Sequence, residues 1–579
     1  MVDRYYEEEL RYLTEAAKEF ARAHPEEARL LDIESLTDRD PYVERLFEGF
    51  AFLAGRIREK LDDEFPELAK SLFETLWPHY LRPIPSLAIL EFQPRAGLLQ
   101  KSQKVSAGTP VLSNPIGRER LRCRFKTCYP LTLHPIYLRQ ALPDRTPSGK
   151  PAIRMKFSIE SGVELGQLEL SELRFFLHAD PAAAFQLHLS LTHQLDSVLV
   201  LPSGARLGGK ESIRSAGFSD EEGILPTGRS THPAYRLLQE YFAFREKFLF
   251  VTLSGLEKLE LPKGAQEFEL QLVLEKALPE GLRFSEENFR LYCTPIINLF
   301  DHDAEPLRVE HNRLAYRVIP NAKSPEGFEV YSVETISGIE FGTGRLHNYR
   351  SFHEFQFEGD SPSSAKRSFN WSSDFGPSER WEATISLHGI PLDADQPQPE
   401  NLSIGTKATN GKLPRDLGEG DISTPTDESP SMATFANLTK PTLPLYPPRR
   451  EFFLWRLLSH MVHSHLSLGD SRAVRQVLEL YDWSQQEANR RRIEGIRDIK
   501  VTPRDWLLRG AVVRGVAIAV ELDEGHFAGR GDAHIFGLVL REFFRRYVTL
   551  NSVVELTILL LPSLETYHWP PQEGTQALL

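Results

Sequence analysis

Residues 41–86 constrain the fold more than any other stretch, because they place a broad apolar stripe along one face of a helix. Small residues lie among the larger ones, which lets a second helix approach closely. Pro66 fits the first position of a following helix, where its missing N–H costs nothing, and that helix runs to Pro78. Such a stripe must be covered by this chain or by another one. Its apolar residues at helical spacing are Val43, Leu46, Phe47, Phe50, Leu53, Ala54, Ile57 and Leu61.

Length and composition indicate a large protein without membrane spans. A chain of 579 residues is too long for one core, so several domains are expected. The net charge of −13 argues against a nucleic-acid-binding role, and Arg490–Arg492 reads as a solvated helix face or a local ion-pair partner. No apolar run approaches the roughly 20 residues that cross a bilayer. The acidic start lacks a secretory signal, and three cysteines fit a reducing compartment. We therefore expect a cytoplasmic protein without membrane insertion.

The hydrophobic period changes along the chain and predicts an α+β multidomain fold. Alternating apolar residues predict strands at 153–159, 187–191, 248–253, 268–274 and 330–336. Near the C-terminus, a helix is predicted over 533–547 and a buried strand over 553–561. We expect an N-terminal helical bundle segment (1–83), β-rich antiparallel subdomains (84–200 and 201–390), a polar linker (391–440) and a mixed α/β domain (441–579).

The predicted linker contains a stretch with few large apolar side chains. Residues 391–431 include the segments PQPEN, NGK, GEGD and TPTDESPS. Such a composition does not bury enough apolar surface to order a chain by itself. We therefore predict a long loop that is mobile or bound to a partner.

Histidine and carboxylate groups do not form a convincing metal site. His460 and His463 share a helix face, but His465 points about 140° away at 100° per residue. His188 and His193 lie five residues apart, which puts them on opposite faces of the predicted strand. The remaining group lacks the glycine and the terminal glutamate of a calcium loop and reads as a charged turn. It consists of Asp301, His302, Asp303 and His311.

Other catalytic signatures are also missing from the sequence. Cys123 and Cys128 have no second pair to complete a zinc site. The glycines of GIEFGTG (338–344) miss the dinucleotide spacing, and no nucleophile elbow of the form G-x-S-x-G occurs. Arg530–Asp532 matches an adhesion tripeptide, but it reads as a turn that opens a helix. We expect no cofactor and no enzyme activity.

Several ordered blocks resemble the TssF family, a baseplate wedge subunit of the bacterial type VI secretion system. They begin with YYEEELRYLTEAAKEFARAHPEEARLL (5–31) and the stretch 41–86, and they span nearly the whole chain. One departure is Lys407–Gly411, where the family tends to show Cys and Arg near Thr-Asn. The later blocks are CTPIINLFDHDAEPL (293–307), EVYSVETISGI (329–339), WRLLSHMVHSHLSL (455–468) and residues 521–553.

The resemblance implies a structural role in a mechanical assembly. Two copies of such a subunit and one TssG are expected to form a wedge, with their N-terminal helices bundled together. Wedges would surround the VgrG spike hub, contact TssK and TssE, and support sheath contraction at an inner-membrane-docked baseplate. Trp77 and Tyr80 would lock the junction to the first β-rich subdomain. The residues expected in the helical bundle interface are Phe47, Phe50, Leu53, Ala54, Ile57, Leu61 and Trp77.

Alternatives remain open at each of these sites. The apolar stripe also fits an internal three-helix core. Phe543, Phe544 and Tyr547 fit either self-association or a core position. A wedge subunit of another phage-like contractile particle has a similar sequence pattern, and a metal-dependent hydrolase would use the 301–311 or 460–465 groups.

Overall fold

The computed structural model describes residues 77–574, apart from 227–232, 263, 352–366, 377, 390–398, 450–452, 454–456, 458–468, 509 and 549–551. Before residue 77 it describes only residues 6, 10, 13, 45, 46, 48–54, 73 and 74. The chain divides into two compact units. The first comprises Met1–Trp77 with Arg449–Met461, and the second comprises Pro78–Pro448 with Val462–Leu579. All the described strands belong to the second unit.

In the first unit, the described residues 48–54 are helical, as their apolar period predicts. Ala51 is fully buried, whereas Phe50 and Leu53 on the same turns are exposed. Phe73 is also buried, and its ring centroid lies 5.5 Å from that of Trp77. Most of the predicted helical bundle (1–83) falls outside the described residues, and the described ones do not establish a bundle.

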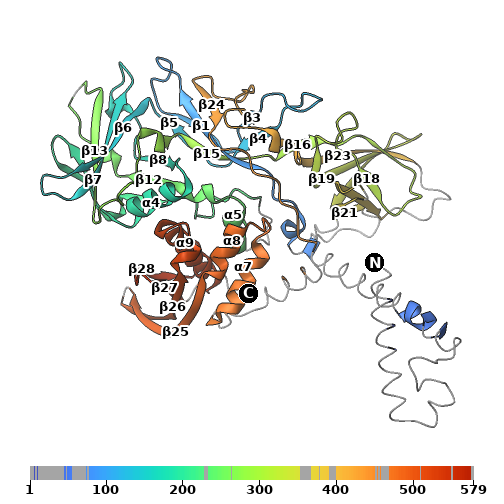
Figure 1. The fold of residues 1–579 in the computed structure, drawn as a ribbon. Helices are drawn as coiled ribbons and strands as arrows, with labels where there is room; N and C mark the ends of the chain where they lie inside the picture. The colour runs from blue at the N-terminus through green and yellow to red at the C-terminus, as the bar shows by residue number, and fades with distance from the viewer. Residues whose placement is uncertain are drawn as a thin grey trace, which may run out of the picture. The chain divides into compact units, whose positions relative to one another are not determined.

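The first sheet of the second unit joins three distant parts of the chain. Its strand order is β24-β1-β15-β4-β3, and every neighbouring pair is antiparallel. β1 is buried over its first six residues, as expected for a strand covered on both faces. Blue β1 lies beside orange β24 in Figure 1. The strands are β1 (Leu87–Pro94), β3 (Pro110–Leu112), β4 (Arg124–Thr127), β15 (Cys293–Ile297) and β24 (Ala433–Asn437).

Two further antiparallel sheets contact helix α4 (Pro181–Thr192). The first has the order β10-β9-β13-β7-β6 and the second has the order β11-β12-β8-β14, and β2 and β5 form a separate pair. The predicted strands at 153–159 and 268–274 are confirmed as β7 and β13. The strands of the two sheets are β6 (Ile136–Arg145), β7 (Pro151–Ile159), β9 (Leu195–Leu201), β10 (Ala205–Gly208), β13 (Glu267–Leu274), and β8 (Glu172–Leu177), β11 (Ile213–Ser215), β12 (Phe250–Ser254), β14 (Phe289–Leu291). The separate pair is β2 (Gln103–Val105) and β5 (Leu131–Leu133).

Residues 187–191 belong to helix α4, so the predicted strand there is wrong. The Asp180 side chain accepts a hydrogen bond from the Ala183 backbone N–H, and Pro181 occupies the first helical position. Alanines at 182–184 then favour the helix. The whole run 187–191 is buried, so its alternating leucines carry no solvent-facing side from which a helical period can be read.

The largest sheet has the order β16-β23-β19-β20-β21-β22-β18, with β17 also paired to β23. Its core includes Ile336, Phe369, Ile385 and Ile404, all nearly fully buried. β20 and β21 pair in parallel, whereas the other pairs are antiparallel. The strands are β16 (Phe300–Asp303), β17 (Leu307–Val309), β18 (Tyr316–Val318), β19 (Glu329–Glu340), β20 (Leu346–Ser351), β21 (Ser368–Phe375), β22 (Trp381–His388) and β23 (Glu400–Thr409).

The linker prediction is wrong for residues 400–409, which form β23 between β16 and β19. Within β23 every second side chain is buried, including Leu402, Ile404 and Ala408. Composition averaged over 391–431 hides this short alternation, because polar neighbours dominate the average. Leu417 and Ile422, further along the same stretch, are fully buried as well. Most of the segment is therefore part of the folded second unit.

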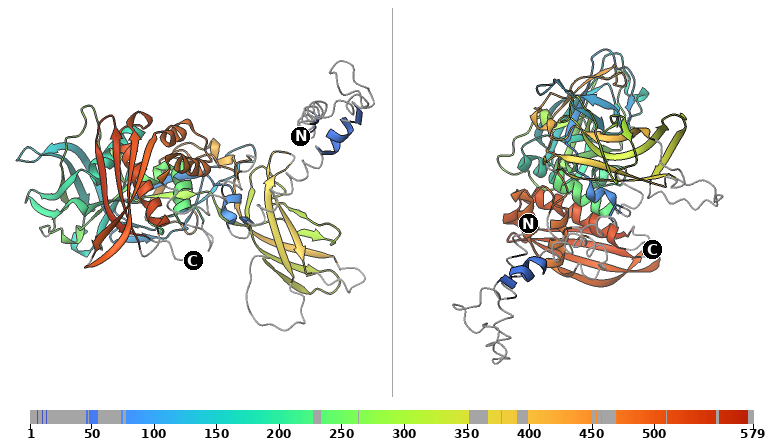
Figure 2. Two further views of the ribbon diagram at one scale, coloured as in Figure 1. Left: turned by 90° about the horizontal axis from the view of Figure 1, so that it is seen from below. Right: turned by 90° about the vertical axis from the view of Figure 1, so that its right-hand side faces the viewer.

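The C-terminal part holds a four-stranded sheet of order β25-β26-β27-β28 with helices α7, α8 and α9. Its long orange strands are visible in Figure 2. The predicted helix at 533–547 and the strand at 553–561 are confirmed as α9 and β27. The elements are α7 (Ser471–Tyr481), α8 (Glu487–Glu494), β25 (Ile496–Leu508), β26 (Ala511–Asp523), α9 (Arg530–Tyr547), β27 (Val553–Leu561) and β28 (Thr566–Glu573).

Sheet pairing crosses the predicted subdomain boundaries. β7, from the predicted first subdomain, pairs with β13, from the second. β1 pairs with β15 on one side and with β24, from the predicted linker, on the other. Because long-range pairing is invisible in local patterns, the boundary at 200 and 201 does not separate two structural subdomains.

Candidate interaction surfaces

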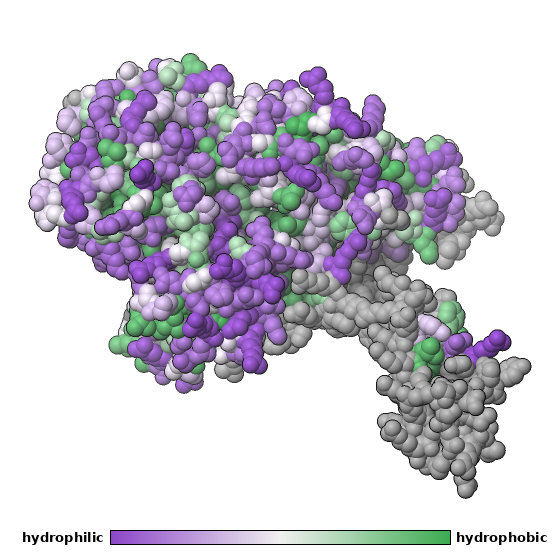
Figure 3. Space-filling view, viewed as in Figure 1, coloured by the Kyte–Doolittle hydropathy of each residue, from purple (hydrophilic) through white to green (hydrophobic). Residues whose placement is uncertain are grey.

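The described part of the apolar stripe presents an open face. Leu46, Phe50 and Leu53 follow each other at helical spacing of four and three residues, and each is 59–63% exposed. Ala54 is partly buried. Hydrophobic side chains of this helix are visible among grey atoms in Figure 3. Large apolar side chains exposed on one helix face are typical of a binding surface. Of the predicted interface residues, Phe47, Ile57 and Leu61 lie outside the described residues.

Tyr80 is fully buried at the start of the second unit, in the short helix η1 (Pro78–Leu81). Its ring centroid lies 5.9 Å from that of Tyr481 at the end of α7, and Tyr481 stacks at 5.2 Å on Tyr235 of helix α5 (Pro233–Ala243). Burial raises the pKa of the Tyr80 hydroxyl well above its usual value. These ring contacts join Tyr80 to α7 and, through Tyr481, to α5, whereas its expected role at the junction with the first β-rich subdomain stays a prediction. Trp77 is half-buried in the first unit.

Two chain segments run side by side where the second unit connects to the first. Ile84 and Leu445 donate backbone N–H groups to each other's carbonyl oxygens, at 2.7 and 2.9 Å. The Leu87 N–H donates to the Thr442 hydroxyl, and the Thr442 N–H donates to the Leu87 carbonyl. The same short ladder therefore ties the segment after Trp77 to the segment before Arg449. Sequence patterns miss this pairing, because both segments are rich in proline.

The aromatic residues of α9 are covered by the chain itself. Phe543 and Phe544 are fully buried, and the Phe543 ring lies 6.2 Å from Tyr235. Of the two expectations for these residues, burial favours the core position over self-association. For Tyr547 the structure describes only the backbone, at the end of α9.

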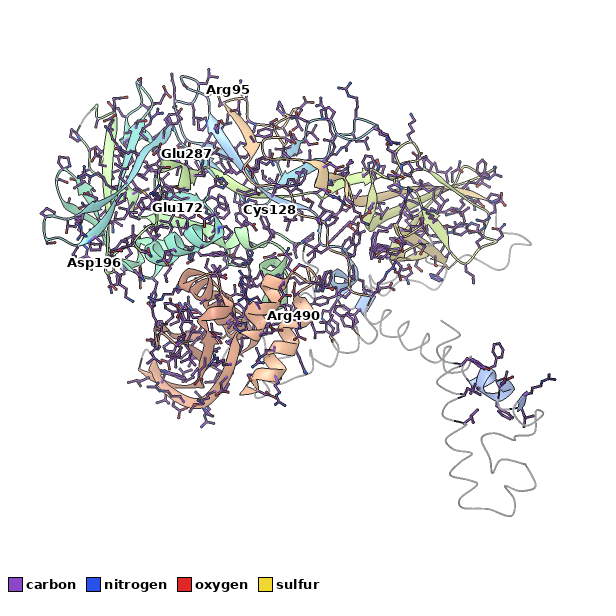
Figure 4. All side chains as sticks on the ribbon, viewed as in Figure 1. Arg95, Cys128, Glu172, Asp196, Glu287 and Arg490 are labelled. Atoms are coloured by element: carbon purple, nitrogen blue, oxygen red, sulfur yellow. The ribbon has the colours of Figure 1, made fainter. Side chains whose placement is uncertain are left out.

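The basic run 490–492 is not uniform. Arg490 is exposed and lies 3.0 Å from Glu494, which confirms the expected local ion pair. Arg491 donates to the Gly525 carbonyl. Arg492, in contrast, is buried and pairs with Asp532 at the start of α9. Figure 4 labels Arg490, which lies on helix α8. A local sequence pattern gives no signal for the partner of Arg492, because Asp532 is distant along the chain.

His188 and His193 are brought together with His534 of α9. Their ring centroids lie 6.1 and 5.1 Å from that of His534, since α4 is a helix and not the predicted strand. Burial lowers the pKa of His188 to about 3 and holds that of His534 well below its usual value. Tyr567 and Trp569 pack against the His534 ring. These aromatic and apolar surroundings fit neutral core histidines.

The other predicted metal candidates do not converge on a common centre. His302 stacks on Phe328 at 4.9 Å, while Asp301 and Asp303 are exposed. His311 lies 3.7 Å from the buried Glu400 carboxylate. Within the described ranges no group of three His, Cys, Asp or Glu side chains is arranged to hold a metal ion. Cys123 and Cys128 are free thiols, and burial raises the pKa of both to about 12. His460, His463 and His465 lie outside the described residues.

The second unit contains an open groove of about 850 Å³. β2, β5, β8 and β11 contribute to its walls, and Glu172, labelled in Figure 4, lies on one of them. His134 in this groove is hydrogen-bonded to the Ser102 hydroxyl at 2.9 Å, and burial lowers its pKa to about 4. Among the described residues no carboxylate is hydrogen-bonded to the His134 ring, as the third member of a catalytic triad would be.

In the part of the chain that the structure describes, none of the helices is long and apolar enough to cross a membrane.

Comparison with known proteins gives consistent matches over the full length. A family model described as "Type VI secretion system, TssF" matches residues 2–576. The type VI secretion system component TssF1 of Pseudomonas aeruginosa is 30% identical over 615 residues, which cover 99% of this chain and 98% of that protein. A chain in the type VI TssK-TssF-TssG baseplate subcomplex, solved by cryo-electron microscopy, has a TM-score of 0.77 at 33% identity and covers 92% of this chain and 99% of its own. A chain in a type VI baseplate complex has a TM-score of 0.65 at 30% identity, with both chains fully covered.

Proposed function

The chain belongs to the TssF family, and from this premise we propose that it is a structural subunit of a type VI secretion baseplate. One observation carries the proposal: the full-length similarity to a chain of the TssK-TssF-TssG subcomplex, at 33% identity and a TM-score of 0.77. Similarity at that level over nearly all of both chains supports the same assembly role. We propose that the protein works by binding other subunits and not by catalysis, in agreement with its open apolar helix face.

TssG and TssK are the partners that this similarity supports directly. We propose that TssG, or a second copy of this chain, covers the stripe around Leu46, Phe50 and Leu53 in a helical bundle. Those side chains are about 60% exposed, and burying the remaining area would supply roughly 1–2 kcal/mol each. The same bundle would include Phe47, Ala54, Ile57, Leu61 and Trp77.

The finer parts of the proposal concern the place of the subunit in the particle. We propose that wedges containing this chain surround the VgrG hub, contact TssE and lie at an inner-membrane-docked baseplate in the cytoplasm. Contraction is triggered when the ring changes arrangement, which needs two interface states that differ by only a few kcal/mol. The paired segments at Ile84 and Leu445 would transmit movement between the first unit and the sheets, because two of the three chain connections to the first unit, at Trp77 and at Arg449, lie close to this ladder in the sequence.

Co-expression with TssG and TssK tests the proposal. The wild-type chain is expected to co-purify with both, and Phe50→Asp is expected to lose TssG, because a carboxylate cannot be buried in an apolar bundle. Leu346→Asp is the matched control, since Leu346 is 65% exposed on a β-strand of the second unit. Leu53→Asp tests the same helix face at a second position and is also expected to lose TssG.

Two results would contradict the proposal at different levels. If the wild-type chain binds neither TssG nor TssK, the baseplate assignment is wrong. If Phe50→Asp and Leu53→Asp both keep TssG with an unchanged mass of the complex, the helix face is not its binding site.

A further inference from the structure

Strands β25 and β26 form an arm that extends past the C-terminal sheet. They pair with each other from Ile496 and Leu522 to Leu508 and Ala511, whereas β27 pairs with β26 only from Gly515 onward. The last four residues of the arm on β26, 511–514, therefore have β25 as their one strand neighbour among the described residues. These long strands are the orange arrows of Figure 2.

The tip of this arm is apolar and uncovered. Leu507 and Val512 are directly opposite each other, and each is 73% exposed. Trp506 and Val513 form the next pair and are half-buried on the other face of the ladder. Leu507 and Val512 are exposed together at the end of the arm, and binding another protein surface would remove their apolar area from water.

The tip also carries an exposed cation on an acidic chain, whose net charge is −13. Arg504 is already paired with Glu555 of β27 at 3.3 Å, which leaves Arg514 as the cation nearest the apolar pair. Arg514 is 88% exposed and 3.7 Å from Asp505, so its guanidinium remains available to another carboxylate. A partner surface with exposed carboxylates would complement Arg514.

The groove of about 850 Å³ is lined by carboxylates, cations and apolar side chains that complement the tip of the arm. Exposed Glu169, Glu172 and Glu221 line it and make no ion pair among the described residues. Lys104 and Arg214 line it as well, which provides partners for Asp505. Apolar side chains of Leu131, Leu173 and Phe218 complete the lining.

Open strand edges in the groove also suit an incoming strand. β11 is the outer strand of its sheet, and β2 and β5 form an isolated pair, so each offers an edge without a strand partner among the described residues. β25 is likewise an outer strand, and Pro503 removes one backbone donor from it, which leaves the segment after Pro503 for pairing. An extended segment that adds to such an edge gains backbone hydrogen bonds.

We propose that the β25–β26 tip of one copy of this chain docks in the 850 Å³ groove of a second copy. The contact joins two different surfaces, so each copy can give its tip to one neighbour and receive a tip from another. It depends on the proposed function only in requiring more than one copy in each assembled particle.

Disulfide trapping in the complex with TssG and TssK tests this contact. Leu507→Cys combined with Ser219→Cys, at the groove, is expected to give a crosslinked dimer of this chain under mild oxidation. The matched control pairs Ser219→Cys with Leu142→Cys, an exposed leucine on β6, and is expected to give none. Each single variant controls for the native thiol of Cys293, which lines the groove but is buried.

Charge reversal tests the contact between the tip and the groove independently of the apolar pair. Arg514→Glu is expected to remove most of the crosslinked dimer, and adding Glu221→Arg is expected to restore it. If the Leu507–Ser219 pair gives no more dimer than the control in a complex of full mass, the proposed contact is wrong. Binding of the tip to phosphatidylglycerol vesicles, lost in Leu507→Asp, would also overturn it in favour of a lipid surface. Loss of TssG and TssK from the wild-type chain would instead count against the proposed function.

Discussion

Arg492 of α8 and Asp532 of α9 form an ion pair 2.8 Å long, although both side chains are at least 96% buried. Each has further partners: Arg492 donates to the Ala488 carbonyl, and Asp532 accepts from the Ala528 backbone N–H. Arg245 also approaches Asp532 at 3.8 Å. Because nearly all hydrogen-bonding groups of the pair are used, the cost of removing two charges from water is offset. The pair joins α8 to the first turn of α9.

Replacing Asp532 with alanine is expected to destabilise the second unit by about 3–5 kcal/mol, because Arg492 would remain buried without its carboxylate. Chemical denaturation followed by tryptophan fluorescence would measure the loss. Arg490→Ala is the matched control: its ion pair with Glu494 is mostly exposed, so a change below about 1 kcal/mol is expected. Equal effects of the two variants would contradict this account of the buried pair.

Glu329 on β19 has an unusual environment beside the ladder of Ile84 and Leu445. Tyr446 donates its hydroxyl to the Glu329 carboxylate, with contacts of 2.9 and 2.7 Å to the two oxygens. Burial raises the pKa of Glu329 from 4.5 to about 7, and the Tyr446 hydrogen bond and Lys412 oppose that rise. The protonated carboxyl is thus the favoured form in the folded chain below neutral pH.

The stability that Glu329 contributes is expected to be complete below pH 4.5 and to fall as the pH rises to about 7. A raised folded-state pKa means that the folded chain binds the proton more tightly than the unfolded chain does, so deprotonation favours unfolding. Relative to Glu329→Gln, the wild-type chain should lose up to about 3 kcal/mol between pH 5 and pH 8. Thermal unfolding at both pH values measures this difference. Glu326→Gln, at a carboxylate that is 76% exposed, should show no such dependence.

The order of apolar and polar residues predicted those strands in which apolar side chains recur with a regular period or form a continuous run. Val553–Leu561 and Glu267–Leu274 were predictable as strands, because apolar residues dominate the first and recur at every second position of the other. Residues 187–191 were not, because a helix covered on all sides shows no polar stripe. The strand at 400–409 was missed because only Leu402 and Ile404 among its alternating buried residues are large and apolar, whereas Thr406 and Ala408 are polar or small.

The candidate surfaces were predictable only in part. The apolar stripe of Phe50 and Leu53 is a local pattern, and their side chains are exposed. The groove, the ladder of Ile84 with Leu445 and the buried pair of Arg492 with Asp532 each combine distant segments. No periodicity within one segment carries that information, because it arises from sheet pairing and helix packing.

The histidines between α4 and α9 predict a second dependence on pH, with the opposite sign. Burial lowers the pKa of His188 from 6.5 to about 3, so its contribution to stability is complete above pH 6.5 and is lost as the pH falls below that value. The neighbouring His534 ring, 6.1 Å away, has its pKa held well below the usual value by burial, so it is neutral in the same pH range. His188→Phe should remove about 2 kcal/mol of the acid destabilisation between pH 7 and pH 5. Thermal unfolding of both chains at these pH values measures the change, and His568→Phe, at an exposed ring, should behave like wild type.

Gly531 allows α9 to approach the backbone of α4. A Cβ atom at this position would lie 2.1 Å from the Phe185 carbonyl oxygen, far inside any real contact. Backbone atoms cannot rotate away as a flexible side chain can, so Gly531→Ala must move one helix against the other. The expected loss is about 1–3 kcal/mol in chemical denaturation. Gly166→Ala is the control, because a Cβ there would meet nothing within 4 Å. A Gly531→Ala variant as stable as that control would mean that α4 and α9 do not pack this closely, and the approach of His534 to His188 would then be lost as well.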